Sequence, residues 1–488
     1  MARLLICSVW NSRSRLSLFS LLLALLNILV LLVDDLPQLN TVETFRDDID
    51  YVLETFQYMN DLQYGKAAVR SVFEKARDVR EFWRCYLSWP KNFVEQGWIK
   101  NDDYFLFSAT YDRRSNSLYP SNHAIQVIIN SYFHISIFSV EVYCNIYNMK
   151  NGKYIVVKGV VREIWQRAWD PRDYFYIPNL LTCPLPNRFS NNNHLAVSIT
   201  VTLCNSNSKA ILSLLFVTFK GMDFLDDISQ KLIEWIEMQF LLGADTITVY
   251  TYYIHPKVQK VLDYYSTKRF LTVVPLDLPG NSPNQNYIRS KFIWRNRQQK
   301  RRHELIPYND CLYRHINTHK YILILDIDEV IVPLKHMDWE SFIREVERNN
   351  TKHDITSISI RNVFKFPLKQ SNTSYPEYMY LLRNQRRSET ISKPGDYGKS
   401  FVSTKSVATV FNHFALHRLY QNVSKTIYIK EEIALKLHYK NECPIESRME
   451  CSQLKTITIN DTSLDRFADK LIESVENTLN DLNLWKKI

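Results

Sequence analysis

The chain has 488 residues, a formal net charge of +10, 45% hydrophobic residues and only 9 glycines. This composition excludes a disordered or low-complexity chain, and the length predicts more than one folded region, because single cores stop growing below this size. The positive charge raises the question of nucleic acid, and one stretch is strongly basic: Arg295, Arg297, Lys300, Arg301 and Arg302. Its helix-compatible composition favours a solvated face, or a docking surface for an anionic substrate or a membrane, so we expect no nucleic-acid partner.

The N-terminus carries a candidate membrane anchor. An almost wholly apolar run extends from Leu16 to Val33, close to the minimum length that crosses a bilayer. Arginines precede this run and Asp34 and Asp35 follow it, which predicts a cytoplasmic tail over 1–15 and a single-pass type II topology. The alternative is a cleaved signal peptide, although the run exceeds the usual hydrophobic segment and no Ala-x-Ala-like site follows it. Both interpretations place the body of the chain in the secretory pathway.

Sequons and cysteines agree with a lumenal location. Four N-glycosylation sequons begin at Asn349, Asn372, Asn422 and Asn460. Seven cysteines follow the apolar run, and an oxidising lumen favours pairs among them. Cys443 with Cys451 would close the shortest sensible loop, and Cys144 with Cys183 would tie a strand to a turn. The spacing leaves the connectivity open.

The lumenal part divides into three regions by pattern. Residues 34–103 are polar with scattered aromatics and are expected as a stem. Residues 104–193 are expected as a β-rich region, because β-branched and aromatic runs alternate there with turn residues. The expected strands lie within Tyr104–Ala109, Ala124–Phe138, Val140–Ile146 and Tyr154–Val161. Residues 194–488 are expected as an α/β catalytic domain.

Strands and helices alternate at the start of this last region. The expected elements are, in order, a strand over 211–219, a helix from Asp226 to Gly243, a strand over 246–252, a helix from Pro256 and a strand over 270–276. Asp226 is a suitable N-cap, Gly243 a suitable helix end, and Pro256 suits a first helical position, where its missing donor costs nothing. The order predicts a βαβαβ unit.

The candidate chemistry follows a later apolar strand. A helix around Glu304 to Ile316 leads into Tyr321–Leu325, which is expected in the middle of a parallel sheet, and Asp326 and Asp328 come directly after it. Ligands of open α/β sheets bind at such carboxyl ends. Strand periodicity would turn both carboxylates to one side, where they would share a hard cation such as Mn²⁺ or Mg²⁺, with help from the following glutamate. Such an ion stabilises a departing pyrophosphate as a Lewis acid.

A phosphatase of the haloacid-dehalogenase type is the alternative interpretation of the same acidic motif. Such phosphatases carry an apolar strand followed by Asp-x-Asp-x-Thr/Val, and residues 326–330 fit that pattern. That family places the motif on its first strand and needs a later strand ending in further acids. Here strands precede the motif, and no such acidic pair follows it.

Several motifs in series resemble glycosyltransferase family 92, especially its insect branch. They are Lys220–Asp227, Leu241–Asp245, Asn309–Arg314, Leu325–Pro333, Lys393–Ser400, Asn412–Phe414 and Leu437–Lys440, with Ser108–Arg114 and Cys183–Pro186 upstream. The resemblance implies a GT-A fold and a UDP-sugar donor, which is UDP-galactose in the characterised members. It also implies a Mn²⁺-like metal and inversion at the anomeric carbon during transfer to a glycan acceptor on a glycoprotein or glycolipid. The implied location is the Golgi membrane.

Site residues are carried over by motif position. Asp326 would face the donor ribose and the metal, Asp328 would ligate the metal, and a histidine would complete the site, with His438 and His413 as the two candidates. An inverting displacement also needs a carboxylate that deprotonates the acceptor, and the alternatives are Glu432 and Asp396. The remaining candidates have two readings each: Lys399 would neutralise phosphate or face solvent, and Asn309 and Asp310 would orient the donor or cap a helix.

The chain departs from the family pattern at a few positions. Lys440 stands where arginine is common, and Phe411 replaces a residue that is often histidine. The metal acids are intact. A catalytically inactive, glycan-binding member of the family is therefore a third interpretation.

Overall fold

The chain is described here from a computed structural model. It describes residues 93–94, 97–101, 104–114, 123–132, 141–148, 154–172, 174–185, 195–200, 210–212, 221–268, 270–351, 354–367, 374–419, 426–440 and 448–485. The expected membrane anchor over 16–33 lies outside these residues, as do the sequons at Asn372 and Asn422. No helix within the described part of the chain is both long and apolar enough to span a bilayer.

The N-terminal part of the described chain, up to Leu212, forms two five-stranded sheets. The first has the order β2(Ile99–Asn101)-β3(Tyr104–Asp112)-β4(Ala124–Ser131)-β8(Ile177–Pro184)-β7(Val160–Glu163), and the second has the order β1(Phe93–Val94)-β10(Ala210–Leu212)-β9(Leu195–Thr200)-β5(Tyr143–Asn148)-β6(Tyr154–Lys158). The β-rich expectation is therefore confirmed. The sheets also include β1 and β2 from the expected stem, and β9 and β10 from beyond residue 193, which a pattern of local polarity cannot indicate.

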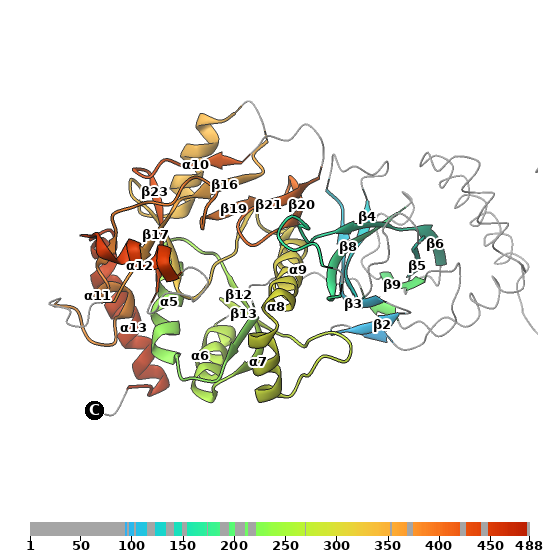
Figure 1. Cartoon of the computed structure of the whole chain (residues 1–488), viewed down its shortest axis with the longest axis horizontal. Coiled ribbons are helices and arrows are strands. Elements are labelled where there is room, and N and C mark those ends of the chain that lie inside the picture. Colours follow the sequence, from blue (N-terminus) through green and yellow to red (C-terminus); the bar gives the residue numbers. More distant parts are fainter. Residues whose placement is uncertain are drawn as a thin grey trace, which may run out of the picture. The chain divides into compact units, whose positions relative to one another are not determined.

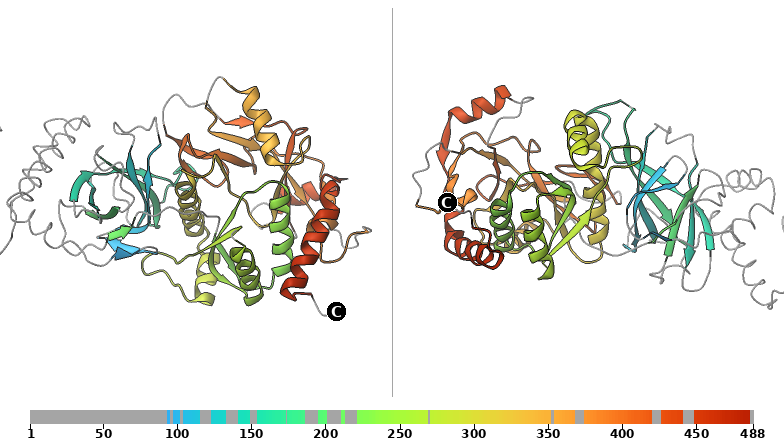
Figure 2. Two further views of the ribbon diagram at one scale, coloured as in Figure 1. Left: turned by 180° about the vertical axis from the view of Figure 1, so that it is seen from behind. Right: turned by 90° about the horizontal axis from the view of Figure 1, so that it is seen from below.

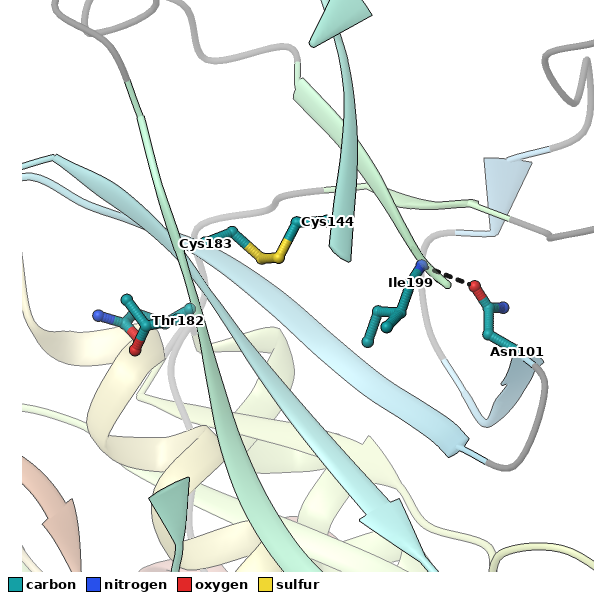
Figure 3. Close-up of a disulfide and its surroundings, with 6 residues drawn as sticks. Asn101, Cys144, Thr182, Cys183 and Ile199 are labelled. Atoms are coloured by element: carbon teal, nitrogen blue, oxygen red, sulfur yellow. Dashed lines mark hydrogen bonds between the residues drawn. A yellow bond between two sulfur atoms is a disulfide. The ribbon is translucent and has the colours of Figure 1, made fainter. Parts of the chain in front are cut away.

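The links between the sheets include a disulfide and a hydrogen bond. A disulfide connects Cys144 of β5 with Cys183 of β8, and the backbone amide of Ile199 in β9 donates to Oδ1 of Asn101 in β2 at 2.9 Å (Figure 3). The sequence singled out this cysteine pair, but Cys183 lies inside a strand and not in a turn.

The expected βαβαβ unit follows, and its helices and parallel order are confirmed. It comprises β11(Gly221–Phe224), α5(Ser229–Leu241), β12(Ile247–Ile254), α6(Pro256–Thr267) and β13(Leu271–Pro275), with β12 paired in parallel to both other strands. Pro256 is the first residue of α6, and Gly243 ends α5 with a φ of 97°.

Two details of this unit differ from the prediction. Its first strand is β11, whereas Ile211 lies in β10 of the N-terminal sheet, because an apolar run does not specify its strand partner. The carboxylate that accepts from the start of α5 belongs to Asp227, which receives the Ser229 amide at 3.1 Å, and not to Asp226.

The rest of the domain is a set of helices and short sheets around two apolar clusters. The helices are α7(Asn286–Arg295), α8(Arg297–His303), α9(Leu305–His315), α10(Trp339–Asn349), α11(Tyr380–Arg383), α12(Arg448–Thr456) and α13(Ala468–Leu482). One sheet has the order β14(Tyr321–Leu323)-β19(Lys399–Ser403)-β16(Ser357–Ile360)-β22(Ile427–Tyr428), and the other has β15(Glu329–Pro333)-β23(Ala434–Tyr439)-β17(Asn362–Lys365)-β18(Arg386–Ser388)-β24(Thr458–Asn460). A hairpin of β20(Val407–Val410) and β21(Ala415–Arg418) completes the fold, and one of the two apolar clusters lies under α9 and β20. The last helix, α13, lies alongside α5 in all views (Figures 1 and 2).

The surroundings of β14 correct one prediction. Tyr321–Leu325 was expected inside a parallel sheet, but β14 covers Tyr321–Leu323 and pairs antiparallel with β19, so that Tyr321 faces Ser403. The strand is apolar because both faces are buried, and burial on both faces does not distinguish a parallel from an antiparallel neighbour.

Buried arginines join the β-rich region to the α/β region. Arg302 is fully buried, with its guanidinium 4.2 Å from the ring centre of Trp165 and 3.2 Å from a carboxylate oxygen of Asp170. Arg114 donates to the backbone carbonyls of Thr404 and Val407. The basic stretch is thus no single solvated face, because its last arginine belongs to the interior.

Candidate functional site

The acidic motif lies in the turn between β14 and β15. Asp326 and Asp328 are partly exposed, while Glu329 is buried as the first residue of β15. The Glu329 amide donates to the Asp326 carbonyl, and the Asp326 amide donates to the Glu329 carboxylate, both at 3.0 Å. A strand had been expected to carry both aspartates on one side. The structure instead has a tight turn that carries both aspartates and is closed by the glutamate side chain.

Glu329 is the buried centre of the acidic motif. Its carboxylate accepts from Lys436 Nζ at 2.6 Å and lies 3.5 Å from Lys399 Nζ. Burial alone would raise the pKa of Glu329, but the two lysines outweigh burial and hold that pKa below its ordinary value. Glu329 is therefore ionised and fixed, and it orients the turn that carries the two aspartates.

One face of β23 supplies the partners of these acids. Lys436, His438 and Lys440 alternate along the strand and its end, and strand periodicity places alternate residues on one side. The register sets Glu329 opposite His438, because β15 and β23 are antiparallel. Lys440 Nζ donates to Asp328 Oδ2 at 2.9 Å, and His438 Nε2 lies 3.4 Å from the same oxygen.

Asp328 carries its charge at the open edge of the site. Burial would raise the pKa of Asp328, but His438 and Lys440 lower it below the ordinary value. Its side chain is 35% exposed and that of Asp326 is 29% exposed, against 2% for Glu329, so the two aspartates are the acids of the motif that a ligand can reach. The backbone carbonyl of Asp328 accepts from the Tyr439 amide at 2.8 Å, which fixes the turn to β23.

His438 has the properties of a metal ligand. Burial, and then the positive charge of Lys436, lower the pKa of His438, so that its imidazole is neutral near pH 7. The ring stacks on Phe364 with the ring centres 5.4 Å apart. Neither ring nitrogen has a well-aligned hydrogen-bond partner among the described residues. A neutral, buried imidazole whose Nε2 lies beside a carboxylate suits a divalent cation.

The protein ligands alone do not complete such a site. Within the described residues, no group of three His, Cys, Asp or Glu side chains is arranged to hold a metal. Mg²⁺ and similar ions are commonly bound by one or two protein groups together with substrate phosphates and water. Asp328 and His438 fit that mode.

Lys399, Asn412 and His413 form the backing of the cluster. Lys399 Nζ, fully buried, lies 3.8 Å from Asp326 Oδ2 and donates to Asn412 Oδ1 at 3.0 Å. His413 Nδ1 donates to the Gly398 carbonyl, and burial lowers the pKa of His413 to about 4. No hydrogen bond or ion pair of the described residues joins His413 to either aspartate, whereas His438 contacts Asp328 directly. Of the two histidine candidates, the structure therefore brings His438 to the metal acids.

Asn309 and Asp310 lie in the middle of α9 and are fully buried. Asn309 exchanges hydrogen bonds with the backbone of Val410, and Asp310 accepts from Tyr250 and Arg314, both at 2.5 Å. These contacts fasten α9 to β12 and β20. Neither side chain is exposed where it could orient a nucleotide-sugar donor.

The two candidate bases lie in different places. Asp396 is exposed in the turn Lys393–Asp396, three residues before Lys399 of the cluster. Glu432 is exposed beside Lys430, before the first residue of β23, whereas His438 lies near the last. The register of β23 therefore separates Glu432 from His438 and the acidic turn, whereas Asp396 is close to the cluster along the chain, through Lys399.

Lys436 is the site residue that sequence reasoning missed. Its signal was a lysine between apolar residues in Ala434–Tyr439, two positions before a histidine. A buried lysine in a strand needs a buried acid, and that requirement could have pointed to Glu329.

Comparison with known proteins places this cluster in a family. No curated protein sequence matches the chain significantly. A family model described as glycosyltransferase family 92 matches residues 215–481, more than half of the chain, and the matched segment contains the acidic turn, Lys399 and β23. The chain therefore belongs to glycosyltransferase family 92, and the activity that this membership carries is glycosyl transfer.

Proposed function

We propose that the chain transfers a sugar, galactose in particular, from a UDP-sugar to a glycan acceptor on a glycoprotein or glycolipid, with inversion and with help from Mn²⁺ or Mg²⁺. The observation that carries this proposal is the pairing of the exposed Asp328 carboxylate with the neutral His438 imidazole in the family-matched segment. The proposal includes a GT-A arrangement, which the parallel order of β11, β12 and β13 supports. It also includes a type II anchor in the Golgi membrane, which rests on the apolar run at 16–33.

The charge balance of the cluster supports a cation bound together with a diphosphate. Three acids, Asp326, Asp328 and Glu329, face three lysines, Lys399, Lys436 and Lys440, so their formal charges cancel. A divalent ion held by Asp328 and His438 would add positive charge where the diphosphate needs it. When bound, the ion would supply Lewis-acid stabilisation of the departing nucleotide.

The protein side chains have separate tasks in this mechanism. Asp328 and His438 would hold the ion, while Glu329, held by its two lysines, keeps the acidic turn in place. Lys440 orients Asp328 through its 2.9 Å contact. Asp396 is the proposed base that takes the proton from the acceptor hydroxyl, because it is the exposed candidate acid nearest in sequence to the cluster residues of β19.

The proposal is tested by a screen of UDP-sugars with the purified full-length chain. Expected are release of UDP and transfer to a glycan acceptor with Mn²⁺, loss of both when a chelator is added, and recovery when Mn²⁺ is restored. Cleavage of a phosphate monoester without UDP release would support the phosphatase alternative, which the antiparallel setting of β14 does not favour. Glycan binding without any turnover would identify an inactive member.

A further inference from the structure

Tyr397 has a backbone conformation that tyrosine rarely adopts. Its φ is 53°, and the only other non-glycine residue with positive φ in the described part of the chain is Asn483. Asn483 follows the last turn of α13, where asparagine is common in this conformation. Tyrosine has no short polar side chain that would offset the steric cost. Glycine or asparagine would suit position 397 better as far as the backbone is concerned.

The turn around Tyr397 is held in place on its far side. A Cβ added to Gly398 would lie 2.5 Å from the carbonyl oxygen of Ile360, so β19 and β16 approach each other there as closely as glycine allows. Lys399 follows and contacts Glu329 and Asp326. The surrounding structure therefore fixes the strained residue, and such residues concentrate at functional sites.

The side chain of Tyr397 lies at the edge of the proposed metal site. Its ring packs edge-on against Phe364, with the ring centres 5.8 Å apart, and Phe364 stacks on His438. His438 in turn contacts Asp328. Residue Tyr397 is nevertheless 42% exposed. An unusual backbone thus holds an exposed aromatic ring two contacts away from the metal acids.

A sugar ring has the chemistry that suits this place. A pyranose presents polarised C–H groups on one face and hydroxyls at its rim, and the electron-rich face of an aromatic ring attracts such groups. Charged and polar side chains of the cluster are available to the hydroxyls. We propose that Tyr397 forms one wall of a pyranose subsite beside Asp328 and His438. This inference rests on the proposed function, and Tyr397 is not among the site residues that the sequence predicted.

The test measures substrate binding in variants of the full-length chain. Tyr397→Phe keeps the ring, and Tyr397→Asn removes the ring but tolerates the positive φ. The matched control is Tyr287→Asn, since Tyr287 is a tyrosine of α7 with 61% exposure. KM and kcat are measured in two assays: hydrolysis of the UDP-sugar without acceptor, and sugar transfer at varied acceptor concentration. Inhibition by UDP alone is measured as well.

The expected result separates a binding role from a structural one. Tyr397→Asn should raise the KM of a sugar-bearing substrate about tenfold, the loss expected for one aromatic stacking contact, with kcat within about threefold. The melting temperature, UDP inhibition, the Tyr397→Phe variant and the Tyr287→Asn control should stay close to wild type. A change confined to the UDP-sugar assigns the donor pyranose, and a change confined to the acceptor assigns the acceptor pyranose.

Two results would overturn the inference on its own. One is unchanged KM values for both substrates in Tyr397→Asn. The other is a weakening of UDP inhibition by the same factor as the rise in KM, which would make Tyr397 part of a nucleotide site. A wild-type chain without transfer activity would overturn the proposed function first, and the pyranose subsite with it.

Discussion

At the scale of single residues, the ion pair of Glu329 with Lys436 decides the shape of the site. Both side chains are almost fully buried, and their charged atoms are 2.6 Å apart. Separating such a pair is costly because the remaining charge stays in a low dielectric. The partly exposed pair of Lys440 with Asp328 keeps access to water and gains less from its contact.

This difference predicts unequal effects of two similar substitutions. Lys436→Met should lower the free energy of unfolding by about 3 kcal/mol, since the buried Glu329 then loses its nearest cation and keeps the more distant Lys399. Lys440→Met should lower it by less than about 1 kcal/mol. Urea denaturation followed by fluorescence measures both. Equal effects would show that Glu329 is not a buried, charge-dependent centre.

Residue-scale placement also distinguishes the two candidate bases. Asp396→Asn should lower kcat at least about a hundredfold, as removal of a general base does, without a change in the melting temperature. Glu432→Gln should leave kcat close to wild type, because Glu432 lies at the other end of β23. The measurement is sugar transfer under saturating substrates. A large loss in Glu432→Gln together with an active Asp396→Asn would reverse the assignment.

At the scale of elements, a buried glutamate joins α5 to α11. Glu234 is fully buried, and both oxygens of its carboxylate accept from the Leu381 amide at 2.9 Å. Burial raises the pKa of Glu234 to about 8, although the backbone donors of α11 oppose this shift. The acid therefore prefers to be protonated in the folded chain and ionised in the unfolded chain at intermediate pH.

The sign of this shift predicts how stability depends on pH. Because the folded-state pKa lies above the ordinary value of 4.5, the contribution of Glu234 is fully present below pH 4.5 and is lost as the pH rises towards 8. Between pH 5 and 8, wild type should therefore lose unfolding free energy relative to Glu234→Gln, whose side chain does not titrate. This pH range follows from the two pKa values. Denaturation of both proteins across this range measures it. A difference that is constant with pH would contradict a raised pKa.

Elements marked by local signals could be predicted from the sequence. Pro256 at the start of α6 and Gly243 at the end of α5 act through their own backbone geometry, so the neighbouring residues suffice to place these ends. The partner of β14 could not be predicted, because Ser403 lies far along the chain from Tyr321 and apolar strands do not encode a direction. The turn at Asp326 was missed for a related reason, since it depends on a hydrogen bond to the buried side chain of Glu329.

The candidate site divides in the same way. Asp328 and His438 were predicted as metal ligands from their residue types and their positions in the family motifs, and the structure brings them within 3.4 Å of each other. Asn309 and Asp310 were singled out by their motif alone, and their polar atoms proved to serve contacts between α9 and its neighbours. Whether a polar residue faces a ligand or the protein depends on packing of distant segments, which the motif does not contain.

At the scale of the whole molecule, a disulfide links the two sheets of the β-rich region. The disulfide between Cys144 and Cys183 closes a loop with a sequence separation of 39 residues (Figure 3). Constraining a loop of that size in the unfolded chain contributes about 4 kcal/mol in the chain-entropy description.

Replacement of both cysteines by alanine should therefore lower the free energy of unfolding of this region by about 4 kcal/mol. The control is Cys311→Ala, which truncates a buried cysteine of α9 outside the disulfide and should cost less. Thermal unfolding under non-reducing conditions measures both. A double variant as stable as wild type would mean that the sheets hold together without the disulfide.

The central claim is that the carboxylate of Asp328, beside the neutral imidazole of His438, positions the cation that makes sugar transfer possible. The most direct measurement is transfer from a UDP-sugar with Mn²⁺ by wild type and by Asp328→Ala, with the fold of each checked by circular dichroism and melting temperature. We predict that the variant folds like wild type and loses transfer by a factor of at least about a thousand, as expected when the metal-held charge stabilisation is removed. Transfer by Asp328→Ala at a rate close to wild type would contradict the claim.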